Sequence, residues 1–147
     1  MDERLLLREL AGNYTLSKQK LVIACVERNM LKTLFSDWEW LNIGLVVSEK
    51  LLKFPKNLRN QNIVEIVKEL IDNNQSERIV VENIDILFSP EYSLDVIKLF
   101  VLAGRSKTLV VHWSGKMEDG FITYSEPIYE DYHRYDIKNY DVYCITK

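Results

Sequence analysis

The sequence predicts an α/β domain with a mostly parallel sheet and helices on both faces. Short, continuous apolar runs recur along the chain, and such runs are typical of strands that are buried on both faces, as in parallel sheets. Segments with helical periodicity lie between these runs, and strands that alternate with helices imply parallel pairing. The chain has 147 residues, of which 47% are hydrophobic, so we expect one globular domain over residues 1–147.

The first third of the chain is expected to hold two buried strands. These strands are the apolar runs at residues 21–25 and 43–47. An apolar stripe predicts a helix over residues 2–14, and a turn with a short helix is expected over residues 29–40. Ser48 is expected to cap a further helix that runs through Leu52.

The rest of the chain continues the alternation. The clearest helix is residues 63–73, where apolar side chains recur at i, i+3, i+4, i+7 and i+8. A second helix is expected over residues 94–103, opened by Ser93 and ended by Gly104. The remaining apolar runs predict strands at residues 78–81, 108–111, 121–124 and 142–145.

Charge, apolar runs and cysteine content indicate which classes of function and which cellular compartment to expect. The formal net charge of −3 argues against a protein that coats nucleic acid by charge alone. The chain shows no signal-peptide pattern and no apolar run of about 18 residues, so we expect a cytoplasmic protein without membrane contact. Cys25 and Cys144 are expected to be reduced, and no metal site is expected because the chain has only two histidines to join them, His112 and His133.

The segment after the first predicted strand resembles a phosphate-binding loop without its glycines. Such a loop has the form G-x-x-x-x-G-K-[ST] between a strand and a helix, and Lys32-Thr33 matches its last two positions. Val26 and Leu31 stand where the glycines belong, and Glu27 adds a carboxylate that would repel a phosphate. The residues therefore favour a structural turn over phosphate binding.

Polar residues also follow the third and fourth long apolar runs. Glu82 ends one run in the manner of a Walker B carboxylate, with Asp85 as a possible substitute for the catalytic glutamate of such ATPases, and Ser114 could sense a bound nucleotide. If nucleotide binds, Lys32 would contact the phosphates while Thr33 and Glu82 serve Mg²⁺. The alternative is that these are ordinary polar residues at strand ends.

The last third of the chain is rich in tyrosine. Tyr124, Tyr129, Tyr132 and Tyr135 are candidates for an interaction surface, since tyrosine is favoured in protein interfaces. Acidic residues lie between them and oppose the stacking of nucleic-acid bases, because they would repel phosphates. The choice is therefore between a protein-binding surface and ordinary packing.

Several stretches resemble one family. IVVENIDILFSP at residues 79–90, LVVHWSG at 109–115 and ITYSEP at 122–127 are similar to BrxF, the small P-loop protein of type 3 BREX bacteriophage-exclusion systems, as is YHRY at 132–135. The resemblance implies a P-loop-NTPase-like three-layer sandwich and a role in antiviral defence. Its five-stranded sheet would have the order 5-1-4-3-2, which places Cys25 and Cys144 on neighbouring strands. Family members typically carry an intact P-loop, and this chain does not.

Three functions follow as expectations. The first is a non-catalytic accessory or assembly subunit (a pseudo-NTPase) that needs no cofactor and binds other defence proteins or further copies of itself. The second is a weak ATP- and Mg²⁺-binding switch or ATPase. The third, less favoured, is a DNA-binding subunit that uses basic residues, namely Lys53, Lys56, Arg59, Arg105 and Lys107.

Overall fold

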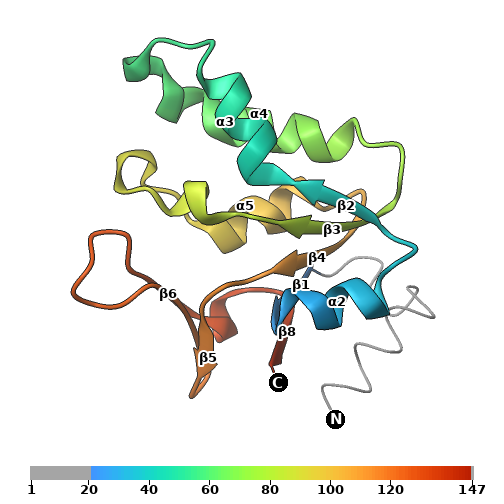
Figure 1. Cartoon of the computed structure of the whole chain (residues 1–147). Coiled ribbons are helices and arrows are strands. Elements are labelled where there is room, and N and C mark those ends of the chain that lie inside the picture. Colours follow the sequence, from blue (N-terminus) through green and yellow to red (C-terminus); the bar gives the residue numbers. More distant parts are fainter. Residues whose placement is uncertain (1–20, 147) are drawn as a thin grey trace.

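The computed structural model describes residues 21–146, which form two sheets (Figure 1). The larger sheet has five strands in the order β2-β3-β4-β1-β8, and all four strand pairings are parallel. The expected α/β class with a mostly parallel sheet is therefore confirmed. The strands are β1 (Leu21–Cys25), β2 (Glu39–Asn42), β3 (Arg78–Glu82), β4 (Thr108–His112) and β8 (Val142–Thr146).

The order of this sheet differs from the expected 5-1-4-3-2 in the strand that closes it. That strand is the eighth of the described chain rather than the fifth, because the segment between β4 and β8 forms three short strands of a separate sheet. The first and last strands are neighbours, and Ile23 lies in register with Cys144. The expected adjacency of the two cysteine-bearing strands is thus confirmed, and both cysteines are free thiols.

The expected strand at residues 43–47 is wrong. These residues begin helix α3 (Ile43–Leu51), and the strand lies just before them as β2. The side chain of Asn42 caps the helix by accepting a hydrogen bond from the Leu45 backbone N–H. Ile43, Val47 and Leu51 are buried at helical spacing, whereas Leu45 is 57% exposed, so the apolar run covers one helix face and not two faces of a strand.

The other described helices lie close to their expected positions. They are α2 (Arg28–Leu34), α4 (Arg59–Asp72) and α5 (Val96–Ala103). Helix α5 starts after Ser93 because the Asp95 side chain accepts from the Lys98 backbone N–H, and Gly104 follows its end as expected. The helix expected over residues 2–14 lies outside the described residues.

Helices cover both faces of the larger sheet (Figure 1). Helices α3, α4 and α5 pack against the face that carries Ile23, Ile79 and Val111. Helix α2 packs against the opposite face, where Val22 and Val110 are buried. Alternate residues of the same strands thus point into two hydrophobic clusters, as a sheet covered on both faces requires.

The smaller sheet is antiparallel and packs beside the larger one. It consists of β5 (Lys116–Glu118), β6 (Phe121–Tyr124) and β7 (His133–Asp136), of which only β6 was expected from the sequence. The buried Trp113 joins the two sheets, because its Nε1–H donates to the Thr123 carbonyl over 3.0 Å.

Candidate functional site

The carboxyl edge of the larger sheet is the place where open parallel sheets usually bind ligands. The polar residues expected at the ends of β3 and β4 do lie there, together with the loop that follows β1. Each of them, however, contacts another part of the same chain. The contacts join Arg28 with Glu82, Asn83 with Asn42, Ser114 with Asp85, and His112 with the carbonyl of Val26.

The loop between β1 and α2 is too short for a phosphate cradle. Only Val26 and Glu27 separate the strand from Arg28, the first residue of the helix. The backbone N–H of Leu31, which stands where a P-loop has its second glycine, donates to the Glu27 carbonyl over 3.3 Å. A phosphate loop instead leaves such N–H groups pointing at the ligand. The backbone around Lys32 is therefore helical and already hydrogen-bonded.

Lys32 and Thr33 lie at the end of α2 and not at its start. The Nζ atom of Lys32 sits 4.2 Å from the ring centroid of Trp40, a cation–π contact. The Thr33 hydroxyl donates to the Asn29 carbonyl over 3.0 Å, within the same helix. Both side chains thus have local partners within the fold.

Glu82 is paired with an arginine that the sequence reasoning missed. Arg28 donates to its carboxylate from Nε over 2.8 Å and from Nη2 over 3.4 Å. The hydrogen bond and the charge of Glu82 raise the pKa of Arg28 above its ordinary value. Because the guanidinium occupies both carboxylate oxygens, a Mg²⁺ ion would have to displace it to reach Glu82.

The adjacent Asn83 links the end of β3 to the end of β2. Its backbone is left-handed, with φ of 58°, a conformation that Asn tolerates better than most residues. Its Nδ2 donates to Oδ1 of Asn42 over 2.9 Å, and the same oxygen caps α3. A Cβ atom on Gly44 would lie 2.5 Å from Nδ2 and 2.6 Å from the carbonyl oxygen of Asn83, so glycine permits this approach. An asparagine directly before an apolar run is the sequence signal that could have identified this cap.

The other polar pair joins Asp85 and Ser114. The Ser114 hydroxyl donates to Oδ1 of Asp85 over 3.1 Å, so these two candidates are brought together. Tyr124 lies near them, and burial raises its pKa to about 12, with the charges of Asp85 and Asp131 adding to the rise. Nearby, Nε2–H of His112 donates to the Val26 carbonyl over 2.9 Å, which satisfies the histidine within the fold.

The tyrosine set divides into packed and exposed members. Tyr135 is buried, and its hydroxyl accepts from the Val96 backbone N–H over 3.1 Å. Tyr124 stacks on Phe88 with ring centroids 3.7 Å apart. Tyr132 is half-buried, and Tyr129 is 57% exposed. Tyr135 therefore serves packing, Tyr124 is partly buried against Phe88, and Tyr129 is the most exposed of the four, so an interaction surface that includes Tyr124, Tyr129 and Tyr132 stays a prediction.

The basic residues of the DNA-binding hypothesis lie in two separate parts of the fold. Lys53 and Lys56 lie between α3 and α4, and Arg59 begins α4. Arg105 and Lys107 precede β4, at the amino end of that strand. The Nζ atom of Lys107 donates to the carbonyls of Asn74 and Ser76, so it is committed to the fold. The five residues do not form one continuous set.

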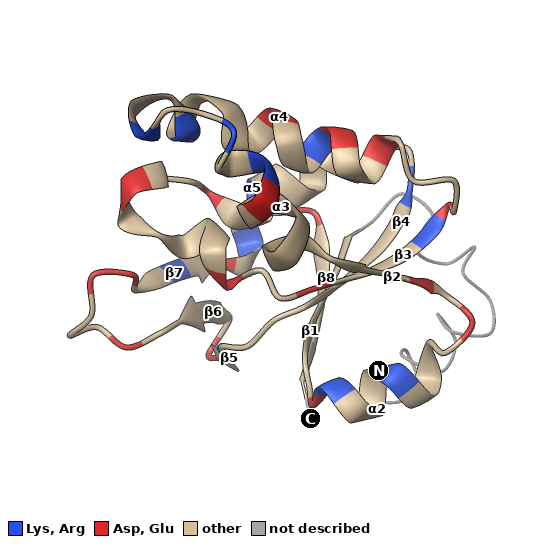
Figure 2. Cartoon of the chain, turned by 45° about the horizontal axis from the view of Figure 1, so that its top comes forward, with Lys and Arg blue, Asp and Glu red and all other residues tan. Residues whose placement is uncertain are grey.

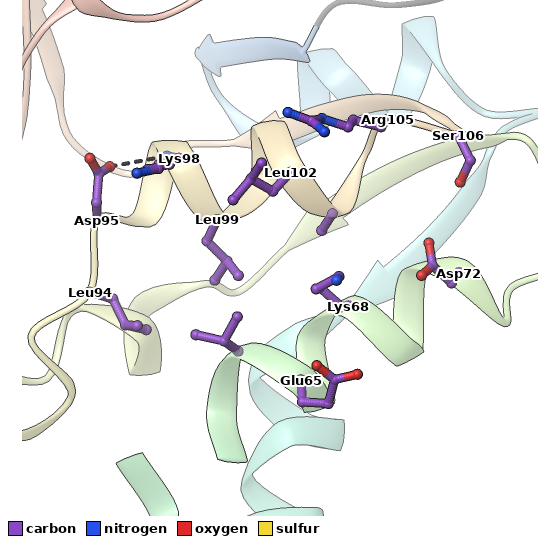
Figure 3. Close-up of a pocket in the computed structure, with 12 residues that line it drawn as sticks. Glu65, Lys68, Asp72, Leu94, Asp95, Lys98, Leu99, Leu102, Arg105 and Ser106 are labelled. Carbon is purple, nitrogen blue, oxygen red and sulfur yellow. Dashed lines mark hydrogen bonds between the residues drawn. The ribbon is translucent and has the colours of Figure 1, made fainter. Parts of the chain in front are cut away.

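A groove of about 610 Å³ lies between α4 and α5 (Figure 3). Apolar side chains such as Leu99 and Leu102 line it, and charges of both signs, including Glu65 and Lys68, surround them. None of the residues expected to bind nucleotide lines the groove. Its mixed charges do not select one class of ligand.

Residues 21–146 contain no group of three or more Asp, Glu, His and Cys residues placed to hold a metal ion. No helix among them combines the length and the apolar character that a membrane crossing requires.

Comparisons with known proteins do not assign the chain to a family. No protein-family model, curated protein or solved structure matches it.

Proposed function

We propose that this protein is a non-catalytic accessory subunit of a bacterial anti-phage system of the BREX type, and that it acts by binding proteins. The observation that carries the proposal is the internally paired carboxyl edge of the larger sheet. At this edge the chain's own side chains contact Glu82 and Asp85, and the helix backbone uses the N–H of Leu31. The resemblance of residues 79–135 to BrxF supports the defence role.

The paired edge opposes catalysis for a chemical reason. Phosphoryl transfer depends on positioned cations and N–H groups that stabilise the phosphate charge. Here the candidate Lys32 lies against Trp40, and Arg28 neutralises the candidate Mg²⁺ ligand Glu82. The edge therefore has the interactions of a stable scaffold in place of those of a phosphate site.

The test is ATP hydrolysis by the purified protein, with a Lys32→Ala variant as control. We expect no turnover above the buffer background in either protein. Turnover that Lys32→Ala abolishes would reject the proposal and establish an ATPase with divergent motifs.

The nucleotide switch is the second candidate, and the exposure of the Arg28–Glu82 pair favours it. The Arg28 side chain is 49% exposed, so water can compete for it and the pair can open. An Arg28→Ala variant leaves Glu82 available to Mg²⁺ and is the most favourable case for binding. We expect Mg-ATP to leave its unfolding temperature unchanged, because the short β1–α2 loop still offers no cradle. A shift in this variant alone would make Arg28 an inhibitor of nucleotide binding.

A further inference from the structure

Two exposed segments of opposite charge project from the molecule, and neither contains any of the residues that are paired at the carboxyl edge. The first, called the basic tip, is residues 49–59, which comprise the end of α3, the connection that follows it and the first residue of α4. It holds four basic residues and one carboxylate. The second, called the acidic loop, is residues 125–132 between β6 and β7. It holds three carboxylates and neither lysine nor arginine.

The basic tip presents cations and apolar side chains together. Lys50, Lys53 and Lys56 are exposed, and the structure shows no hydrogen bond or ion pair for their side chains with other described residues. Leu52 is 73% exposed and Leu58 is 37% exposed. An apolar side chain as exposed as Leu52, close in the sequence to three exposed lysines, is typical of a surface that meets an apolar and acidic partner.

The acidic loop has the complementary chemistry. Ile128 is 84% exposed and Tyr129 is 57% exposed, with Glu126 and Glu130 beside them. Two backbone bonds hold its turns: Tyr129 N–H donates to Glu126 over 2.9 Å, and Tyr132 N–H donates to Tyr129 over 3.2 Å. Because the turns are formed in the free protein, the loop loses less conformational entropy on binding.

Both segments project from the same side of the molecule (Figures 1 and 2). In Figure 2 the basic residues of the α3–α4 connection and the acidic residues of the loop before β7 both lie at the left of the view. A two-fold axis on that side would place each segment opposite its complement in another copy. One rotation then satisfies both contacts, as an interface between identical subunits requires.

We propose that the partner of this side is a second copy of the chain, with the acidic loop of each copy docked on the basic tip of the other. Ile128 and Tyr129 would cover Leu52 and Leu58, and the glutamates would face the lysines. A polyanion such as DNA fits this side less well, because the acidic loop would repel its phosphates. The inference uses residues other than those paired at the carboxyl edge, so the nucleotide tests neither support nor reject it.

The first experiment measures the mass of the full-length protein by sedimentation at about 100 µM, which detects weak dimers. We expect a dimer at about 50 mM salt and an increase in Kd of about tenfold at about 500 mM salt, because salt screens exposed charges. Ile128→Lys removes the apolar contact and adds a cation that faces the lysines of the basic tip, so it should give a monomer at both salt concentrations. Lys138→Glu, a charge change at an exposed residue outside both segments, should leave the dimer intact.

Complementary charge reversals separate this interface from any other. The double variant Lys53→Glu/Lys56→Glu and the double variant Glu126→Lys/Glu130→Lys should each be monomeric alone. An equal mixture should form a heterodimer, because one of its two contacts is native and the other has both charges reversed. Circular dichroism checks that each variant is folded.

Three outcomes would overturn the proposal. They are a wild-type monomer at low salt, a dimer that Ile128→Lys does not dissociate, and a mixture of the two double variants that stays monomeric. A species larger than a dimer would reject the two-fold arrangement.

Discussion

The carboxyl edge of the larger sheet and the two projecting segments differ in how their polar groups are paired. At the edge, carboxylates and amides lie at the ends of neighbouring strands and contact one another, as in the Arg28–Glu82 and Asn42–Asn83 pairs. In the basic tip and the acidic loop, lysines and glutamates point into solvent beside exposed apolar side chains. The edge has polar residues at the strand ends, which is the sequence pattern of a ligand-binding site. The projecting segments have exposed charged and apolar side chains, which are the surface properties of a protein-binding site.

Position at the end of a strand does not by itself make a binding site. A ligand needs groups that are left unsatisfied by the chain, because a group that is already paired must first be released at a cost in free energy. By that criterion the edge contributes to stability and the projecting segments to association. Substitutions in the edge should therefore change the free energy of unfolding, and substitutions in the segments should change the oligomeric state.

The largest effect is expected for Trp113→Ala. Trp113 is buried, contacts Phe88 edge-to-face with ring centroids 5.1 Å apart, and donates to Thr123 across the two sheets. We expect a loss of about 3–5 kcal/mol in the free energy of unfolding, the usual range for a buried Trp→Ala change. Urea unfolding measures it. A loss below about 1 kcal/mol would mean that the smaller sheet is not held in this way.

Gly44→Ala tests the close contact between the start of α3 and Asn83, which follows β3. The added Cβ would meet the backbone and side chain of Asn83, neither of which can move without disturbing the cap on α3. A loss of about 1–3 kcal/mol is expected from this overpacking. Ser48→Ala, on the exposed side of the same helix, is the matched control and should cost less than about 0.5 kcal/mol. Equal effects of the two substitutions would contradict the close approach.

Tyr135→Phe compares a packed tyrosine with an exposed one. The change removes the acceptor of the buried Val96 N–H, which should cost about 1–2 kcal/mol. Tyr129→Phe removes the same hydroxyl from an exposed position and should be close to neutral. If both variants unfold at the same urea concentration, Tyr135 does not have the structural role described.

The same tyrosine predicts a dependence of stability on pH. Burial raises the pKa of Tyr135 to about 12, above the value of about 10 for an unfolded chain. Its contribution is fully present below about pH 10 and is lost as pH rises toward about 12, because the unfolded state ionises first. Measuring the free energy of unfolding across this range should give a shallower fall for Tyr135→Phe than for the wild type. Parallel curves would contradict the raised pKa.

The smallest effect on stability is expected for the basic tip. Lys53→Glu/Lys56→Glu alters exposed side chains and should change the free energy of unfolding of the monomer by less than about 0.5 kcal/mol. The measurement is made at about 500 mM salt, where the dimer is weakened. A larger loss in the free energy of unfolding would mean that these lysines stabilise the fold, and the basic tip would then not differ from the carboxyl edge.

The sequence predicted the interior of the fold better than its edges. The strands at residues 21–25, 78–81 and 108–111 were foreseen because burial on both faces leaves a continuous apolar run. Strand β2 was missed because it is a short strand at the edge of the sheet that contains Glu39 and Asn42. Tertiary pairing decides such strands, and local composition does not reveal it.

For the candidate site, the sequence indicated which residues follow the strands but not what they contact. Arg28 is 54 positions from Glu82, and the sequence around either residue does not indicate that the two form an ion pair. The spacing of Lys32-Thr33 after β1 matched a phosphate loop, yet without glycines the chain enters the helix at Arg28. Positive φ is not available to Val26 at low cost, so the backbone takes the helical path.

The most direct test of the account is thermal unfolding of the wild-type protein with and without millimolar Mg-ATP and Mg-ADP. A ligand at about 100 times its Kd would add about 2.7 kcal/mol of stability, which such a measurement detects readily. We expect the unfolding temperature to stay unchanged with either nucleotide. A clear rise that disappears in Lys32→Ala would contradict it, because the paired edge would then open to bind phosphate.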